Sequence, residues 1–107
     1  MLARPSLSEA NVESYLVKEI EKRRGICEKM ASLSRRGFFD RLIVMPGGRV
    51  FFVECKRPKG GRLSPHQRER HRQYAWNGAV VLTLATRAEV DRFLAEMAAW
   101  AKGHKKG

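Results

Sequence analysis

Residues 40–58 read DRLIVMPGGRVFFVECKRP, and this stretch decides the fold. The runs Asp40 to Met45 and Arg49 to Arg57 are rich in β-branched and aromatic residues, which favour strands. Between them lie a proline and two glycines at 46–48, which are typical turn residues. The sequence therefore predicts a β-hairpin.

The second strand of this hairpin ends in charged residues. Side chains alternate along a strand, so Glu54 and Lys56 share one face with Val50 and Phe52, while the odd-numbered residues 51–55 face the other way. Both faces are apolar until Glu54. Burial of charge is costly unless it is compensated, so a charged pair at this place indicates a function rather than solubility alone.

The turn decides whether a second acid joins this pair. A three-residue loop at 46–48 puts Asp40 opposite Glu54, whereas a two-residue loop puts it opposite Cys55. Loops of three residues that end in a left-handed glycine are common, and Gly48 can supply one. Two carboxylates directly opposite each other repel, and a divalent cation would turn that repulsion into ligation.

An oxygen-rich site of this kind suits Mg²⁺ or Mn²⁺ rather than zinc, which would favour histidines and cysteines. A hard cation can polarise a phosphodiester and lower the pKa of a bound water. A lysine beside it can orient the attacking water, accept its proton or stabilise the charge on phosphorus.

The rest of the chain predicts three helices around the sheet. Ser6 and Glu9 have capping-box spacing, and an apolar stripe then runs to Gly25. Residues 26–33 are a possible strand, Pro65 to Gly78 a helix capped by Ser64, and Ala79 to Ala85 a strand covered on both faces. A last helix follows the Thr86 and Glu89 capping box. We expect a single α/β domain over residues 1–107, ordered αβββαβα, with a mixed sheet flanked by helices and a frayed basic tail at 103–107.

The charge of the chain indicates its partner. The 22 Lys and Arg residues against 11 Asp and Glu give a net charge of +11, which implies a polyanion such as a nucleic acid. The basic residues are spread along the chain rather than gathered on one amphipathic helix, so anionic lipid is the weaker candidate. The sequence shows no signal peptide or membrane span, and we expect an intracellular, cytoplasmic protein with reduced thiols at Cys27 and Cys55.

These residues resemble a known family. Asp40 followed by Glu54-Cys55-Lys56 is similar to the bipartite site of the PD-(D/E)xK nuclease superfamily. VESYL, RRGFFDR, PGGRVFFVECKRP and LSPHQ together resemble the virus-type replication-repair nuclease family, VRR-NUC, in its stand-alone phage or bacterial form. The similarity runs from Glu9 to about Leu94. It implies a restriction-endonuclease-like core.

The resemblance also implies roles for individual residues. Glu13, Asp40 and Glu54 would be acids of the metal site, with Glu13 acting directly or through water. The backbone carbonyl of Cys55 would be a ligand, and Lys56 would be the catalytic lysine. One position departs from the family pattern, because Phe39 stands where a proline usually precedes the aspartate.

Gln67 has two interpretations. It matches the family's glutamine near the active site, and it also lies at the capping-box position relative to Ser64. The histidines at 66, 71 and 104 lack metal-site spacing and are expected at the surface. Tyr74, Trp76 and Trp100 are expected in the core or an interface.

Five basic residues are candidates for binding the DNA backbone: Arg35, Arg36, Arg57, Lys59 and Arg62. The hypothesis is then a metal-dependent, structure-selective DNA endonuclease. The family implies 5′-phosphate and 3′-hydroxyl ends, and a homodimer that resembles Holliday-junction resolvases in acting on four-way junctions. The alternatives are a monomeric flap or nicking nuclease and a non-catalytic basic DNA-binding module. A phage or phage-infected bacterial origin would suit the family.

Overall fold

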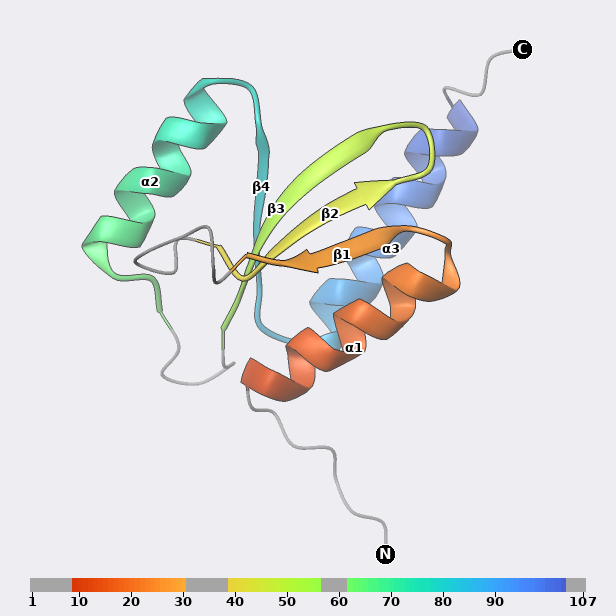
Figure 1. The fold of residues 1–107 in the computed structure, drawn as a ribbon, viewed down its shortest axis with the longest axis horizontal. Coiled ribbons are helices and arrows are strands. Elements are labelled where there is room, and N and C mark those ends of the chain that lie inside the picture. The colour runs from red at the N-terminus through yellow and green to blue at the C-terminus, as the bar shows by residue number, and fades with distance from the viewer. Residues whose placement is uncertain (1–8, 31–38, 57–61, 104–107) are drawn as a thin grey trace, which may run out of the picture.

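A computed structural model describes residues 9–30, 39–56 and 62–103. Its elements follow the predicted αβββαβα order (Figure 1). They are α1 (Glu9–Lys22), β1 (Ile26–Lys29), β2 (Arg41–Met45), β3 (Arg49–Cys55), α2 (Pro65–Trp76), β4 (Val80–Leu84) and α3 (Arg87–Gly103).

The four strands form one mixed sheet in the order β1-β2-β3-β4. The first three strands are antiparallel, and β4 runs parallel to β3. In the hairpin Met45 pairs with Arg49, so the loop has three residues, as the first of the two registers required. The N–H of Gly48 donates to the carbonyl of Met45 at 2.9 Å, and both loop glycines have positive φ, a conformation that L side chains rarely adopt.

The helices cover both faces of the sheet, which confirms the predicted layers. The helices α1 and α3 lie on one side, and α2 stands on the other (Figure 1). Phe51 of β3 meets Phe93 of α3, whereas Phe52 on the opposite face meets Tyr74 of α2. The main core lies under α1 and α3, and it contains the apolar stripes of both helices.

The strand at 80–84 differs from the expectation of a strand buried on both faces. It is β4, at the edge of the sheet, and Val80 and Thr83 are exposed. Its apolar run reflects parallel pairing with β3 rather than full burial. Edge position leaves one side of the strand without a neighbour, and three helices are too few to cover all of both faces.

One aromatic position also differs from the prediction. His71 is buried rather than at the surface, because it stacks on Phe39 with ring centroids 4.5 Å apart. Trp76 is 87% exposed, so of the two places predicted for it the core is excluded and an interface stays a prediction. Tyr74 packs against Phe39 and Phe52 as expected, and Trp100 lies under the guanidinium of Arg49.

Some predictions fall outside the described residues. These are the capping serine at 6, the strand extension at 31–33 and the basic tail from 104 onward. Within the described ranges, none of the helices combines the length and the hydropathy that a membrane span requires.

Candidate active site

Asp40 and Glu54 lie opposite each other at the end of the hairpin away from its turn. The N–H of Asp40 donates to the carbonyl of Val53 at 2.8 Å, so Asp40 continues the pairing that joins Arg41 to Val53. The carboxylate of Asp40 accepts the N–H of Cys55 through Oδ2 at 2.7 Å. The thiol of Cys55 is buried in the core, so only the backbone of this residue faces the acid.

Glu54 is a buried carboxylate with two polar side chains on one of its oxygens. Its side chain is 3% exposed, and Oε2 lies 3.1 Å from the Nζ of Lys56 and 2.9 Å from the Nε2 of Gln67. The backbone N–H of Lys56 donates to the carbonyl of Leu84 in β4, which fixes this lysine at the sheet end. The other oxygen, Oε1, is buried and has no hydrogen-bond partner among the described residues.

The surroundings of Glu54 oppose its ionisation. Burial, and then the nearby charge of Asp40, raise the pKa of Glu54 to about 7, although Lys56 and Gln67 pull it down. A buried acid that is half-protonated near neutral pH is unusual for a purely structural role, and such groups cluster at functional sites.

Gln67 performs both of the roles that its sequence position left open. Its side-chain Oε1 accepts a hydrogen bond from the backbone N–H of Ser64. Its backbone N–H donates to the Ser64 hydroxyl, and both distances are 3.0 Å. The remaining Nε2 group donates to Glu54. The first turn of α2 and the buried carboxylate are therefore joined through one amide.

Glu13 reaches the same end of the sheet from α1, on the opposite face. Its Oε2 lies 2.7 Å from the Nε of Arg41 and 3.4 Å from the Nζ of Lys29. The pKa of the Cys55 thiol is raised by burial and then by the charges of Asp40, Glu13 and Glu54, so all three acids lie around this strand end. No group of three or more His, Cys, Asp or Glu side chains in the described ranges is already drawn together as a metal site.

The residues around Asp40 and Glu54 nevertheless fit a hard cation. Both offer carboxylate oxygens, Oε1 of Glu54 lacks a partner among the described residues, and the mutual effect of the two acids is repulsive. Carboxylate oxygens are the ligands that Mg²⁺ or Mn²⁺ prefer. Glu13 is the acid that would have to exchange its present partners to join them.

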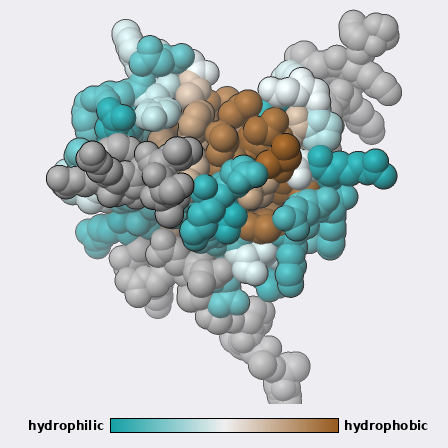
Figure 2. Space-filling model, viewed as in Figure 1, coloured by the Kyte–Doolittle hydropathy of each residue, from teal (hydrophilic) through white to brown (hydrophobic). Residues whose placement is uncertain are grey.

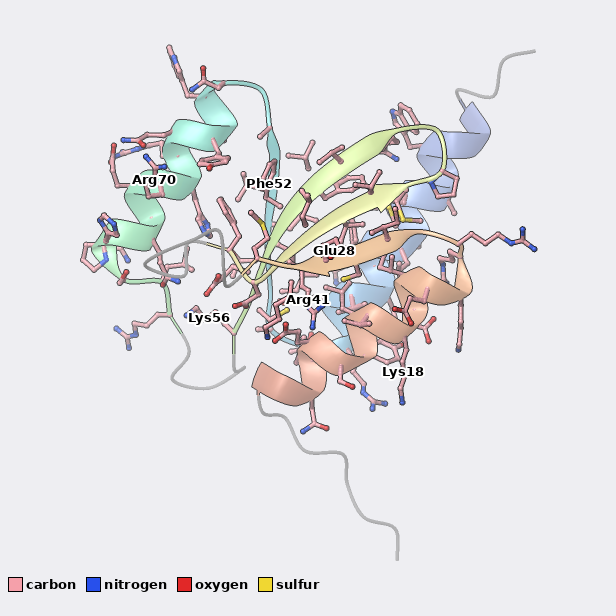
Figure 3. All side chains as sticks on the ribbon, viewed as in Figure 1. Lys18, Glu28, Arg41, Phe52, Lys56 and Arg70 are labelled. Atoms are coloured by element: carbon pink, nitrogen blue, oxygen red, sulfur yellow. The ribbon has the colours of Figure 1, made fainter. Side chains whose placement is uncertain are left out.

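Two cations of this region were missed by the sequence analysis. Arg41 and Lys29 lie beside Glu13, and Figure 3 shows Arg41 where the sheet meets α1, at the same end as Lys56. Alternation could have found Arg41, because it pairs with Val53 and so points to the opposite face from Glu54. Of the five predicted DNA-binding residues, Arg62 is exposed, and 35, 36, 57 and 59 lie outside the described residues.

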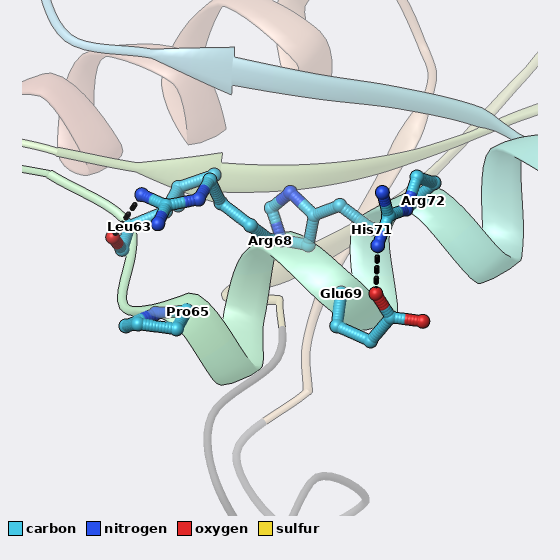
Figure 4. Close-up of a pocket in the computed structure, with 6 residues that line it drawn as sticks. All are labelled: Leu63, Pro65, Arg68, Glu69, His71 and Arg72. Carbon is cyan, nitrogen blue, oxygen red and sulfur yellow. Dashed lines mark hydrogen bonds and ion pairs between the residues drawn. The ribbon is translucent and has the colours of Figure 1, made fainter.

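Phe39, at the position where the resemblance implies a proline, is buried under α2. Its ring stacks on His71 and packs against Phe52 and Tyr74. His71 also lines an open hollow of about 430 Å³ beside α2, together with Arg68 and Arg72 (Figure 4). The residue before Asp40 is therefore held by aromatic packing.

Comparisons with known proteins agree with this arrangement. None of the protein-family models compared matches the chain. A phage protein described as "Putative nuclease p44", from Acyrthosiphon pisum secondary endosymbiont phage 1, is 42% identical over 77 residues, which cover 71% of this chain and 82% of the relative. A solved structure described as "VRR_NUC domain" superposes with a TM-score of 0.77 at 28% identity, and covers 84% of this chain and 97% of its own. The chain belongs to the VRR-NUC family.

Proposed function

We propose that this protein is a metal-dependent DNA endonuclease that hydrolyses phosphodiesters to leave 5′-phosphate and 3′-hydroxyl ends. The observation that carries the proposal is the contact of Lys56 and Gln67 with buried Glu54, across from Asp40. Family membership supports the nuclease activity, and the net charge of +11 supports a nucleic-acid substrate.

Asp40, Glu54 and the Cys55 carbonyl would hold Mg²⁺ or Mn²⁺, with Glu13 as a further acid. When bound, the cation supplies positive charge that polarises the phosphodiester and acidifies water.

The chain's own residues then position and move protons. Lys56 lies on the same face as Glu54, where its ammonium can orient an attacking water or stabilise negative charge on phosphorus. Gln67 keeps the Glu54 carboxylate in one orientation by donating to Oε2, which leaves Oε1 for ligation. Asp40 is oriented in the same way by the N–H of Cys55.

The proposed substrate is branched DNA, with the four-way junction first. A homodimer places two sites about a two-fold axis, as two symmetric cuts require. The sheet supports this assembly, because Ile26, Val44 and Val50 lie side by side on the face that α2 covers only in part. Figure 2 shows apolar residues gathered over the middle of this face.

The test is a gel assay on labelled four-way junction, flap, nicked and linear duplex DNA, in EDTA, Mg²⁺ or Mn²⁺. We expect paired cuts in the junction that require metal and are lost in Lys56→Ala. If metal-dependent cutting is spread over flap or nicked forms, the nuclease activity is right and the four-way junction is wrong as its preferred substrate.

Asp40→Asn separates the nuclease from a basic DNA-binding module. The nuclease variant keeps DNA binding and loses cleavage. If the wild type binds all four DNA forms and cleaves none in either metal, the proposed activity is wrong.

A further inference from the structure

A second charged hollow lies on the α1 side of the acids. It has a volume of about 440 Å³ and opens between α1 and the ends of β1 and β2. Its wall carries three cations, Lys18, Lys29 and Arg41, and the acids Glu13 and Glu21. Positive charge is therefore in excess there, and Arg41 directly follows Asp40 in the chain.

Arg41 is held in place before any ligand arrives. Its Nε donates to Glu13 Oε2 at 2.7 Å, and its Nη1 donates to the carbonyl of Cys27 at 3.2 Å. The side chain is only 18% exposed. A guanidinium has five N–H donors in a rigid fork that matches phosphate oxygens, so a group fixed in this way can still bind one.

Lys29 is more exposed than Arg41 and more loosely paired with Glu13. Its Nζ lies 3.4 Å from the same oxygen of Glu13 that Arg41 holds at 2.7 Å, and its side chain is 60% exposed. One carboxylate oxygen thus faces two cations. An exposed ion pair of this length is weak, so Lys29 can turn to another anion at little cost.

We propose that Lys29 and Arg41, with Lys18 across the hollow, bind a phosphate of the DNA strand next to the scissile one, and that this phosphate displaces Glu13 from the two cations. The proposal rests on the proposed function for its ligand. A strand that crosses the end of the sheet with one phosphodiester at Asp40 and Glu54 brings a neighbouring phosphate to the α1 face. Release of Glu13 then frees this acid at the end of the sheet that also carries Asp40 and Glu54.

The chain offers a matched pair of lysines to test the phosphate site. Lys22 is 67% exposed and pairs with Glu19 at 3.0 Å on a different part of α1, so Lys22→Ala removes the same charge from an equivalent ion pair. Binding of a labelled linear duplex is measured by fluorescence anisotropy in EDTA over a series of salt concentrations. No cleavage occurs in EDTA, and the duplex makes the result independent of junction preference.

We expect Lys29→Ala to weaken binding several-fold more than Lys22→Ala, and to make the slope of log affinity against log salt shallower by about one. Equal effects of the two substitutions would overturn the proposal. Absence of wild-type binding to any DNA would overturn it together with the proposed function.

A second pair of variants tests the displacement of Glu13. Glu13→Gln removes the acid that holds Lys29 and Arg41, while Glu19→Gln removes the acid that holds Lys22 and Arg23. We expect Glu13→Gln to tighten DNA binding in EDTA more than Glu19→Gln does. The reason is that Lys29 and Arg41, which Glu13 holds, lie where the DNA strand is proposed to run. If both substitutions tighten DNA binding equally, the gain reflects only the change in net charge, and the proposed displacement of Glu13 is wrong.

The phosphate site and the nuclease activity can be disproved separately. If the wild type cleaves DNA in Mg²⁺ but Lys29→Ala binds like Lys22→Ala, the phosphate site is wrong and the nuclease stands. If Lys29→Ala loses binding selectively and no DNA form is ever cleaved, Lys29 still binds a DNA phosphate, but the activity and the place of that phosphate beside a scissile one are wrong.

Discussion

Glu54 is a buried carboxylate that lowers the stability of the fold at the position where the proposed function needs an acid. An apolar residue there would pack without desolvating a charge, and the hairpin would be more stable for it. The carboxylate instead carries an oxygen that has no partner among the described residues and lies across from Asp40. Such a group costs stability, and the proposed ligation of a cation would account for that cost.

The burial of this carboxylate predicts how stability depends on pH in the absence of metal. The pKa of Glu54 is raised from 4.5 to about 7 in the folded protein. Between those values the folded state holds a proton that the unfolded chain releases, so stability falls as pH rises through this window. A shift of this size corresponds to a loss on the order of 3 kcal/mol in the free energy of unfolding.

The glutamine of the Glu54→Gln variant cannot ionise, so we expect this variant to keep its free energy of unfolding as pH rises. Its melting temperature in EDTA should exceed that of the wild type by a margin that grows from pH 5 to pH 8. Thermal unfolding followed by circular dichroism measures this, with Glu28→Gln as a control in an exposed acid of the same sheet. A margin that is constant with pH would contradict the assignment.

The double role of Gln67 makes a second prediction at the residue scale. Ser64→Ala removes the N-cap hydroxyl and leaves the contact with Glu54, whereas Gln67→Ala removes that contact together with the capping-box bond from the Ser64 N–H. Loss of the N-cap hydroxyl costs about 1 kcal/mol of stability. We expect Ser64→Ala to lower stability by this amount with little change in cleavage rate, and Gln67→Ala to lower both.

Denaturant unfolding and the junction cleavage assay measure the two effects on the same preparations. If Ser64→Ala slows cleavage as much as Gln67→Ala does, Gln67 acts only by capping α2.

At the scale of elements, α2 is tied to the loop before Asp40 by aromatic rings. Phe39 stacks on His71 with an angle of 10° between the rings and meets Tyr74 edge-on, both from α2. A proline at this position would set the backbone directly through its ring. Phe39 fixes the same stretch through packing, so the position of Asp40 depends on α2 being in place.

Phe39→Leu tests this dependence. Leucine keeps an apolar group but loses the ring contacts, which should cost about 1–2 kcal/mol of stability. We expect the cleavage rate to fall more than this loss of folded protein explains, because Asp40 is adjacent. The measurement compares denaturant unfolding with cleavage at a temperature where the variant stays folded. An unchanged rate per folded molecule would mean that Asp40 is positioned independently of α2.

The hairpin shows why parts of this fold could be predicted from the sequence. Its register follows from local chemistry, since two adjacent glycines at 47 and 48 supply both positive φ angles of a three-residue loop. Once the loop length is known, alternation places Glu54 and Lys56 on one face. Helix starts were equally local, because Ser64 and Pro65 mark the start of α2.

Features that depend on packing between distant elements could not be predicted in this way. The burial of His71 requires Phe39, which is 32 positions earlier, and periodicity within α2 does not reveal it. The contact of Arg41 with Glu13 joins β2 to α1. The edge position of β4 follows from the order of the strands in the sheet, which its apolar run does not indicate.

At the scale of the whole molecule, net charge and exposed apolar surface have opposite effects on dimer formation. Two copies that each carry +11 repel each other, so a dimer requires a contact that is largely free of charge. The side-by-side residues Ile26, Val44 and Val50 provide one on the open face of the sheet. A second copy packed on this face would leave the acids at the sheet end free for DNA.

We therefore expect the wild type to be a dimer in solution and Val50→Asp to be a monomer. Val80→Asp is the matched control, because Val80 is a similarly exposed valine of the same sheet that pairs with Phe51 on the other face. Light scattering at several protein concentrations, with and without four-way junction, gives the mass. The monomeric variant should cut one strand of a junction at a time, since paired cuts need two sites held together. A wild type that stays monomeric with the junction bound would remove the dimer and favour the flap or nicking enzyme instead.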